Sequence, residues 1–241
     1  MNHSEQSKWV IEEVFPGLRG GFFVELGAGD GIENSDTYTL EKYFGWDGIC
    51  IEANKNLFKY LSRNRQSVCA NVCVDKKVNE VSFIDNGYAS GIIADDTDNS
   101  KNYNKAAFNI AAFKKHGKVK KIRTKMFCNV LVQCKSPAII HYLSLDVEGA
   151  ETRILCNFCF DRFMFLSMTI EQPTKKLNQI LHDNDYVFVK NMPISGKRED
   201  SFYIHKSIDN GSIKKEEFSQ VRRRKPYIAK VNLLKYLKKR D

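Results

Sequence analysis

The stretch FFVELGAGDG at residues 22–31 places five mostly apolar residues directly before a turn that contains three glycines. A short apolar run that stops at a glycine-rich segment predicts a buried strand followed by a tight turn. Residues 35–44 then show the helical spacing of apolar side chains, and Gly45 stands where a helix ends. This part of the chain therefore predicts a strand, a glycine turn and a helix in succession.

The same alternation continues through most of the chain. Strands are expected at 48–52, 68–74, 139–145 and 163–170, with helices at 57–61, 150–155 and 177–182. Strands that alternate with helices form a parallel sheet. Residues 186–190 and 201–205 indicate a closing antiparallel pair. We expect an α/β fold with a mainly parallel sheet, this strand pair and helices on both faces.

A polar segment interrupts the alternation between about residues 85 and 118. It is rich in Asn, Asp and Lys and lacks sustained periodicity, which favours an insertion with a short helix near residues 105–113. Regular structure is expected again over residues 119–132. The predicted organisation is one domain over residues 1–206 and a basic, helical tail over 207–241.

The composition excludes several classes of protein. The chain has 241 residues, of which 42% are hydrophobic and 28% charged, and this suits one globular domain. No apolar run reaches the roughly 20 residues that a membrane-spanning helix needs. The first residues, MNHSEQSKWVIEEVF, lack the apolar core of a secretory signal. We therefore expect a cytoplasmic protein without a transmembrane segment.

The positive charge is concentrated in two blocks. The net charge is +9, and residues 214–241 alone contribute 11 basic and 3 acidic side chains. Residues 114–125 contain seven Lys or Arg and no acid. Both blocks could contact a nucleic acid or another acidic surface. The alternative for the tail is a solvated amphipathic helix at 228–237 that docks through its apolar face.

The seven cysteines stand mostly in apolar contexts, at Cys50, Cys69, Cys73, Cys128, Cys134, Cys156 and Cys159. An odd number in such contexts is typical of buried thiols in a reducing compartment. The pairs Cys69/Cys73 and Cys156/Cys159 have a spacing that zinc sites also use. We favour free thiols, because Cys69 and Cys73 share one face of an expected strand.

Acidic side chains mark the ends of the expected parallel strands, where an open α/β sheet binds its ligand. They are Glu25, Glu52, Asp75, Asp146 and Glu171. Carboxylates repel phosphate, which disfavours a dinucleotide or ATP. Glu52 lies about 20 residues beyond the glycine turn, where an acid accepts hydrogen bonds from ribose hydroxyls. A cationic, phosphate-free nucleoside, S-adenosylmethionine, is the expected ligand.

Four segments together resemble the FkbM family of S-adenosylmethionine-dependent methyltransferases. They are FFVELGAGDG, SDTYTLEKYFGWDGICIEAN, LSLDVEGAETRIL, and the strand ending at Glu171 together with DSFYI at 200–204. The resemblance implies a Rossmann-like class I methyltransferase fold. It also implies that the cofactor contacts Glu25, Gly27, Ala28, Gly29, Asp30 and Glu52, with Asp75 near the adenine. The alternative for Asp75 is a solvated turn carboxylate. Many members carry Ser-Asn-Thr where this chain has Ser35-Asp36-Thr37.

Three carboxylates are candidates for the chemical step. Asp146 and Glu171 end neighbouring strands, and Glu148 follows Asp146 by two residues. Carboxylates on adjacent strand ends can converge, so we expect one of the three to act as a general base for an acceptor hydroxyl. The alternative is a divalent cation such as Mg²⁺, held by Asp146 and Glu171.

The residues around Asp146 also indicate which type of atom accepts the methyl group. Enzymes that methylate base amines usually carry Asn/Asp-Pro-Pro-Tyr/Phe here, whereas this chain has Asp146-Val147-Glu148-Gly149. An oxygen acceptor is therefore favoured. The resemblance points to a hydroxyl of a sugar, a glycan or a small natural product. The alternative is the ribose 2′-hydroxyl of RNA, held by the basic tail.

Overall fold

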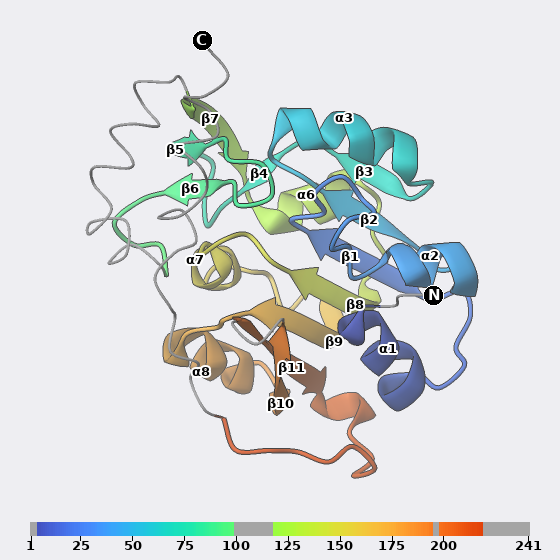
Figure 1. The fold of residues 1–241 in the computed structure, drawn as a ribbon. Coiled ribbons are helices and arrows are strands. Elements are labelled where there is room, and N and C mark those ends of the chain that lie inside the picture. Colours follow the sequence, from blue (N-terminus) through green and yellow to red (C-terminus); the bar gives the residue numbers. More distant parts are fainter. Residues whose placement is uncertain (1–3, 99–117, 195–197, 219–241) are drawn as a thin grey trace.

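The computed structural model describes residues 4–98, 118–194 and 198–218. Two expected helices, near residues 105–113 and 228–237, lie outside these ranges. Within them, the chain folds around a seven-stranded sheet with the order β10-β11-β9-β8-β1-β2-β3 (Figure 1). The α/β fold with a mainly parallel sheet is confirmed.

The strands of this main sheet follow the sequence expectations closely. They are β1 (Phe22–Leu26), β2 (Asp47–Ile51), β3 (Val68–Ala70), β8 (Ile139–Leu145), β9 (Met164–Glu171), β10 (Tyr186–Ile194) and β11 (Arg198–His205). Strand β11 is antiparallel to both of its neighbours, β9 and β10. It therefore supplies the closing antiparallel pair, in which both strands extend beyond their predicted bounds.

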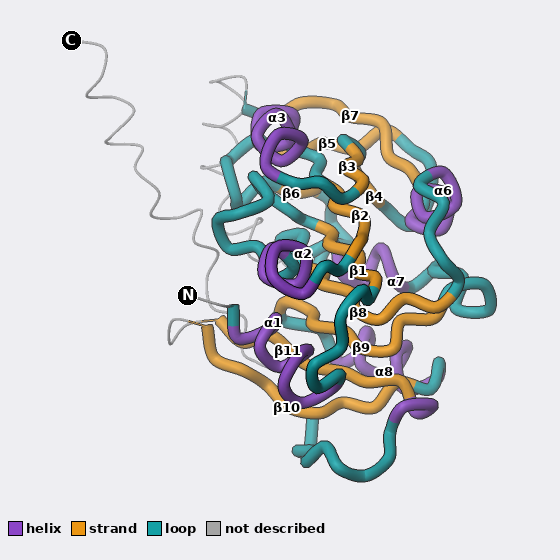
Figure 2. Tube along the Cα trace, turned by 90° about the vertical axis from the view of Figure 1, so that its right-hand side faces the viewer, coloured by secondary structure: helices purple, strands orange, loops and turns teal. Residues whose placement is uncertain are grey.

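Helices cover both faces of the main sheet (Figure 2). One face carries α1 (Glu5–Trp9) with the wide turn η1 (Val10–Val14), α2 (Tyr38–Phe44) and α3 (Lys55–Asn64). The other carries α6 (Phe127–Gln133), α7 (Glu151–Leu155) and α8 (Lys175–Asp183). A short helical turn, η2 (Lys206–Ile208), follows β11. Each face has its own cluster of buried apolar side chains, one around Trp9 and Leu40, the other around Leu131 and Leu177.

A second, four-stranded sheet departs from the expectations. Its order is β4-β7-β5-β6, formed by β4 (Cys73–Val74), β5 (Glu80–Ile84), β6 (Gly91–Ile93) and β7 (Val119–Lys125). The single strand predicted at 68–74 is wrong, because the chain leaves the main sheet after Ala70 and Cys73 pairs with Thr124 of β7. Part of the predicted polar insertion is also a strand, since β6 pairs with β5.

The two sheets together define where a ligand can bind. Strand β1 pairs with β2 on one side and with β8 on the other, although β8 comes more than 100 residues later in the chain. This is the switch point of the main sheet, where the crevice at the strand ends forms. The backbone N–H of Asp146 donates to the carbonyl of Leu26 at 3.0 Å and so joins the two strand ends.

Two of the seven cysteines form a disulfide, between Cys128 of α6 and Cys159 before β9. Their Cα atoms lie 6.2 Å apart, because α6 packs against the turn that precedes β9. The expectation of seven free thiols is therefore wrong for this pair. The four-thiolate zinc alternative is also excluded, since Cys159 was one of its four ligands.

The first residues of the tail pack against the edge of the main sheet. The N–H of Glu216 donates to the carbonyl of Val189 at 2.7 Å, and the ring of Phe218 contacts Phe188. Packed structure thus continues past residue 206, where the tail was predicted to begin. Among the described residues, no helix combines the length and the apolar character that crossing a membrane requires.

Candidate functional site

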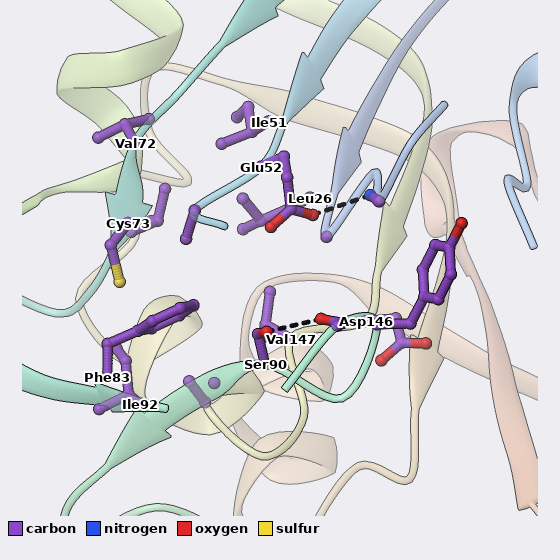
Figure 3. A pocket seen from close by; sticks show the side chains of 18 residues that line it. Leu26, Ile51, Glu52, Val72, Cys73, Phe83, Ser90, Ile92, Asp146 and Val147 are labelled. Atoms are coloured by element: carbon purple, nitrogen blue, oxygen red, sulfur yellow. Dashed lines mark hydrogen bonds between the residues drawn. The ribbon is translucent and has the colours of Figure 1, made fainter. Parts of the chain in front are cut away.

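A pocket lies at the carboxyl ends of β1, β2 and β8 and is closed on the other side by the second sheet (Figure 3). Among the described residues, its wall combines glycines, two acids and several apolar side chains, with no Lys or Arg: Leu26, Gly27, Gly29, Ile51, Glu52, Ala53, Val72, Cys73, Val74, Phe83, Gly87, Tyr88, Ser90, Gly91, Ile92, Asp146, Val147 and Ala150. A phosphate group would find no cation on this wall.

The glycine turn brings the end of β1 against the end of β8. Gly27 has a φ of +93°, in the region that L side chains rarely adopt. A Cβ atom on Gly27 would lie 1.7 Å from the carbonyl oxygen of Asp146. The N–H groups of Gly27 and Ala28 both donate to the carbonyl of Ile51 at 3.0 Å. Only glycine at position 27 allows this close approach of the two strand ends.

Glu52 extends from the end of β2 into the pocket and is 7% exposed. Its Oε2 accepts from the N–H of Gly29 at 2.8 Å (Figure 3), and its Oε1 accepts from the N–H of Asn54 at 2.6 Å. Burial raises the pKa of Glu52 to about 7, although these two N–H groups favour the ionised form. Each carboxylate oxygen keeps a second lone pair for a ligand hydroxyl.

Glu25 was predicted to contact the cofactor, but it lies outside the pocket wall. Its carboxylate is buried, and it accepts hydrogen bonds from the hydroxyls of Ser35 and Thr37 and from the N–H of Asp36. Arg65 donates to it at 3.2 Å. Glu25 therefore holds the segment that follows the glycine turn, rather than facing the pocket.

Three other residues predicted to contact the cofactor also lie off the pocket wall. Ala28 is buried among the apolar side chains on the α1 face of the main sheet. Asp30 accepts from the N–H groups of Ile32 and Glu33 and so closes its own turn. Asp75 is 1% exposed, which contradicts the solvated alternative.

Asp75 instead forms a buried ion pair with Arg153 of α7. Its two oxygens accept from Nε at 3.0 Å and from Nη2 at 2.7 Å. The carboxylate needs this partner because an isolated buried charge is costly. This ion pair links Asp75, directly after β4, to α7, and Asp75 is not among the residues that line the pocket.

The three candidate catalytic carboxylates do come together. Oxygen atoms of Asp146, Glu148 and Glu171 all lie within 4.8 Å of one another. Asp146 is exposed and lines the pocket, whereas Glu171 is buried. Glu148 has a φ of +58°, which turns the chain sharply between β8 and α7. The expected convergence of these strand-end acids is thus present in the structure, on the side of the pocket formed by β8.

Asp36 is a further acid near this cluster that sequence reasoning did not assign to the site. Its Oδ2 accepts from the hydroxyl of Ser144, at the end of β8, at 2.8 Å. Burial raises the pKa of Asp36 well above its ordinary value, and the negative charges of Asp200 and Glu25 add to this effect.

An Asp36→Asn variant is expected to be more stable than the wild type at neutral and alkaline pH. An unfolded Asp ionises near pH 4, whereas folded Asp36 keeps its proton to higher pH, so ionisation costs stability as the pH rises between the two pKa values. The gain in melting temperature should be at least about 2–4 °C at pH 8, which corresponds to 1 kcal/mol, and should vanish near pH 4. The exposed Asp161→Asn is the control. A gain independent of pH would contradict the expectation.

Sequence reasoning missed the part of the pocket that the insertion supplies. Tyr88 and Ile92 of the insertion line the pocket, together with Phe83 of β5, which directly precedes the insertion. The hydroxyl of Tyr88 donates to Glu33 at 3.1 Å, beyond the glycine turn. The N–H of Asp98 donates to the carbonyl of Gly149 at 2.7 Å and ties the insertion to the β8–α7 turn. In the sequence, the short apolar run Gly91-Ile92-Ile93 is the signal for β6 in this polar segment.

Comparisons with known proteins place the chain in a family. The family model of the methyltransferase FkbM domain matches residues 25–188. An FkbM methyltransferase from Methylobacillus flagellatus KT is similar in structure at 12% identity and a TM-score of 0.48, over 82% of this chain and 48% of that one. This chain thus spans about half the length of the Methylobacillus flagellatus protein. The comparison with curated proteins gave no match.

Two other solved structures show a similar fold. One is a protein of the NADB-Rossmann superfamily from Streptococcus agalactiae, with 12% identity and a TM-score of 0.43 over 91% of this chain and 72% of that one. The other is Aeropyrum pernix fibrillarin with natively bound S-adenosyl-L-methionine, with 10% identity and a TM-score of 0.45 over 83% of this chain and 72% of that one.

Proposed function

This chain belongs to the FkbM methyltransferase family, and we propose that it transfers the methyl group of S-adenosylmethionine to a hydroxyl oxygen of a sugar, a glycan or a small natural product. The observation that carries the proposal is Glu52, a buried carboxylate in a pocket to whose wall the described part of the chain contributes no Lys or Arg. Such a wall suits a nucleoside that has ribose hydroxyls and no phosphate.

The pocket residues divide into three roles. Glu52 accepts from the ribose hydroxyls, since its oxygens have lone pairs beyond those used by Gly29 and Asn54. The apolar side chains of Val72, Phe83 and Ile92 also line the pocket and suit the flat adenine ring. Gly27 and Gly29 leave room for the methionine part beside Asp146.

The carboxylate cluster serves the acceptor. Bound S-adenosylmethionine supplies an electrophilic methyl group on a sulfonium. The acceptor oxygen must lose a proton as it attacks, and a carboxylate of Asp146, Glu148 or Glu171 takes that proton. The alternative is a divalent cation such as Mg²⁺, for which three carboxylates within 4.8 Å and water molecules offer suitable oxygen ligands. Such a cation would lower the pKa of the acceptor hydroxyl.

Titration with S-adenosylmethionine by calorimetry tests the cofactor assignment. We expect wild-type binding to weaken at least tenfold in Glu52→Ala, because a hydrogen bond to a charged group contributes about 1.5–3 kcal/mol. The affinity should also fall below pH 7, by up to tenfold per pH unit, since the Glu52 carboxylate protonates there. Glu52→Gln should bind weakly at every pH. Wild-type affinity in Glu52→Ala would refute the assignment.

Substitution of the cluster tests the acceptor side. We expect Glu171→Gln to reduce methyl transfer at least 100-fold while S-adenosylmethionine binding changes less than threefold, since general base catalysis contributes about 10²–10⁴-fold. Addition of EDTA, followed by Mg²⁺, separates the general base from the metal alternative. Full activity in single Ala variants of Asp146, Glu148 and Glu171 would remove the cluster from the mechanism.

The ribose 2′-hydroxyl of RNA is a second candidate acceptor. One observation favours it: β7 carries Lys120, Lys121, Arg123 and Lys125 within six residues, next to the cofactor pocket. Labelled methyl transfer to RNA and to oligosaccharide pools distinguishes the two acceptor classes.

A further inference from the structure

A second cavity, of about 340 Å³, opens between the start of α3 and the face of the second sheet. We name it the basic groove. Four cationic side chains line it together with polar and apolar residues: Ala53, Asn54, Lys55, Asn71, Val72, Cys73, Phe83, Asp85, Lys120, Ile122, Arg123 and Lys125. It shares Ala53, Val72, Cys73 and Phe83 with the cofactor pocket, so the two cavities adjoin.

The charge of the basic groove is uncompensated. Its one acid, Asp85, is neutralised, because its Oδ2 accepts from Lys120 at 3.1 Å and its Oδ1 from Asn54 at 2.9 Å. Lys125 donates to the neutral amide of Gln133 and keeps its charge. Within the described residues, Lys55 and Arg123 form no ion pair. Three positive charges therefore remain available to a ligand.

The arrangement of these cations favours an extended polyanion. Arg123 and Lys125, which are not paired with an acid among the described residues, lie two residues apart on β7, which is about 7 Å at roughly 3.3 Å per residue. Side chains with this spacing on one face of a strand suit successive phosphates of an extended chain better than a single phosphate ion. Lys55 adds a cation from the opposite wall, at the start of α3. A concave groove also suits a single strand better than a flat membrane surface.

We propose that the basic groove binds the phosphate backbone of single-stranded RNA beside the cofactor pocket. The proposal concerns binding and rests on the proposed function only through the second acceptor candidate. Cations on one strand then contact phosphates without reading the bases, so the affinity depends strongly on salt and weakly on sequence.

The test is fluorescence anisotropy of the full chain with a labelled uridine 12-mer over a range of salt concentrations. The groove variant is Arg123→Gln/Lys125→Gln. The matched control is Lys175→Gln/Lys176→Gln on α8, which loses the same charge at the other end of the main sheet (Figure 1). We expect at least a tenfold loss of RNA affinity in the groove variant and less than twofold in the control. The slope of log K against log salt should fall by about 1.4, because each lost contact to a single strand removes about 0.7.

The proposal would be overturned by no RNA binding of the wild type, by equal losses in the two variants, or by a slope that does not change. Preferential binding to phosphatidylserine vesicles through Arg123 and Lys125 would also overturn it. Calorimetry with S-adenosylmethionine separates the two proposals, because the groove variant should bind the cofactor as the wild type does. RNA binding without cofactor binding would contradict only the proposed function.

Discussion

Gly27→Ala is expected to abolish measurable S-adenosylmethionine binding and to lower the free energy of unfolding by more than about 3 kcal/mol. Two costs act together. The φ of +93° strains any L side chain, typically by about 1–3 kcal/mol. The new Cβ would also meet the carbonyl oxygen of Asp146 at 1.7 Å, a backbone atom that cannot rotate away. Relief of that contact requires the ends of β1 and β8 to separate.

Gly45→Ala is the matched control for this prediction. Gly45 ends α2 with a φ of +66°, and a Cβ atom added there would meet no atom within 4 Å. The control therefore has the backbone cost without the collision, about 1 kcal/mol. Chemical denaturation and calorimetry measure both effects. If Gly27→Ala bound the cofactor normally and lost no more stability than Gly45→Ala, the prediction would be wrong. The close approach of the strand ends would then be required neither for cofactor binding nor for stability.

Arg65→Met is expected to reduce the free energy of unfolding by about 3–5 kcal/mol, the usual cost of leaving a buried charge without its partner. The guanidinium of Arg65 contacts Glu25 at 3.2 Å and Glu41 at 2.9 Å. It also donates to the hydroxyls of Ser35 and Thr37. Its loss leaves the Glu25 carboxylate buried among neutral donors, so the segment after the glycine turn should loosen.

The control is Arg63→Met, an exposed position in the last turn of α3, two residues before Arg65, which should change stability by less than about 0.5 kcal/mol. Urea denaturation of the two variants gives the comparison. Hydrogen exchange of residues 31–37 then tests the local effect, because loosening of that segment should raise its exchange rate in Arg65→Met alone. A loss of less than 1 kcal/mol in Arg65→Met would show that Glu25 does not depend on this partner.

The sequence predicted the strand ends well because local patterns determine them. Glu52, Asp146 and Glu171 each follow an apolar run, and parallel strands place such residues on one edge of the sheet. The roles of Glu25 and Asp75 could not be predicted in this way. Their partners, Arg65 and Arg153, lie 40 and 78 residues away in the chain, so no local pattern pairs them.

The second sheet was unpredictable for a related reason. Cys73 and Val74 continue the apolar run of β3, and only their pairing with β7, about 50 residues later, removes them from the main sheet. The polar composition around Tyr88 likewise resembles a solvated loop. Its place over Gly29 follows from packing against the glycine turn, which a one-dimensional pattern does not contain.

The attachment of the second sheet to the β8–α7 turn has a consequence for protein engineering. Because β5, β6 and the turn between them form one wall of the pocket, the main sheet alone does not complete it. A graft of this segment into a relative would transfer one wall of the pocket without the strand ends that form the other. A deletion that preserved every glycine and acid of the strand ends would still leave the nucleoside open to solvent.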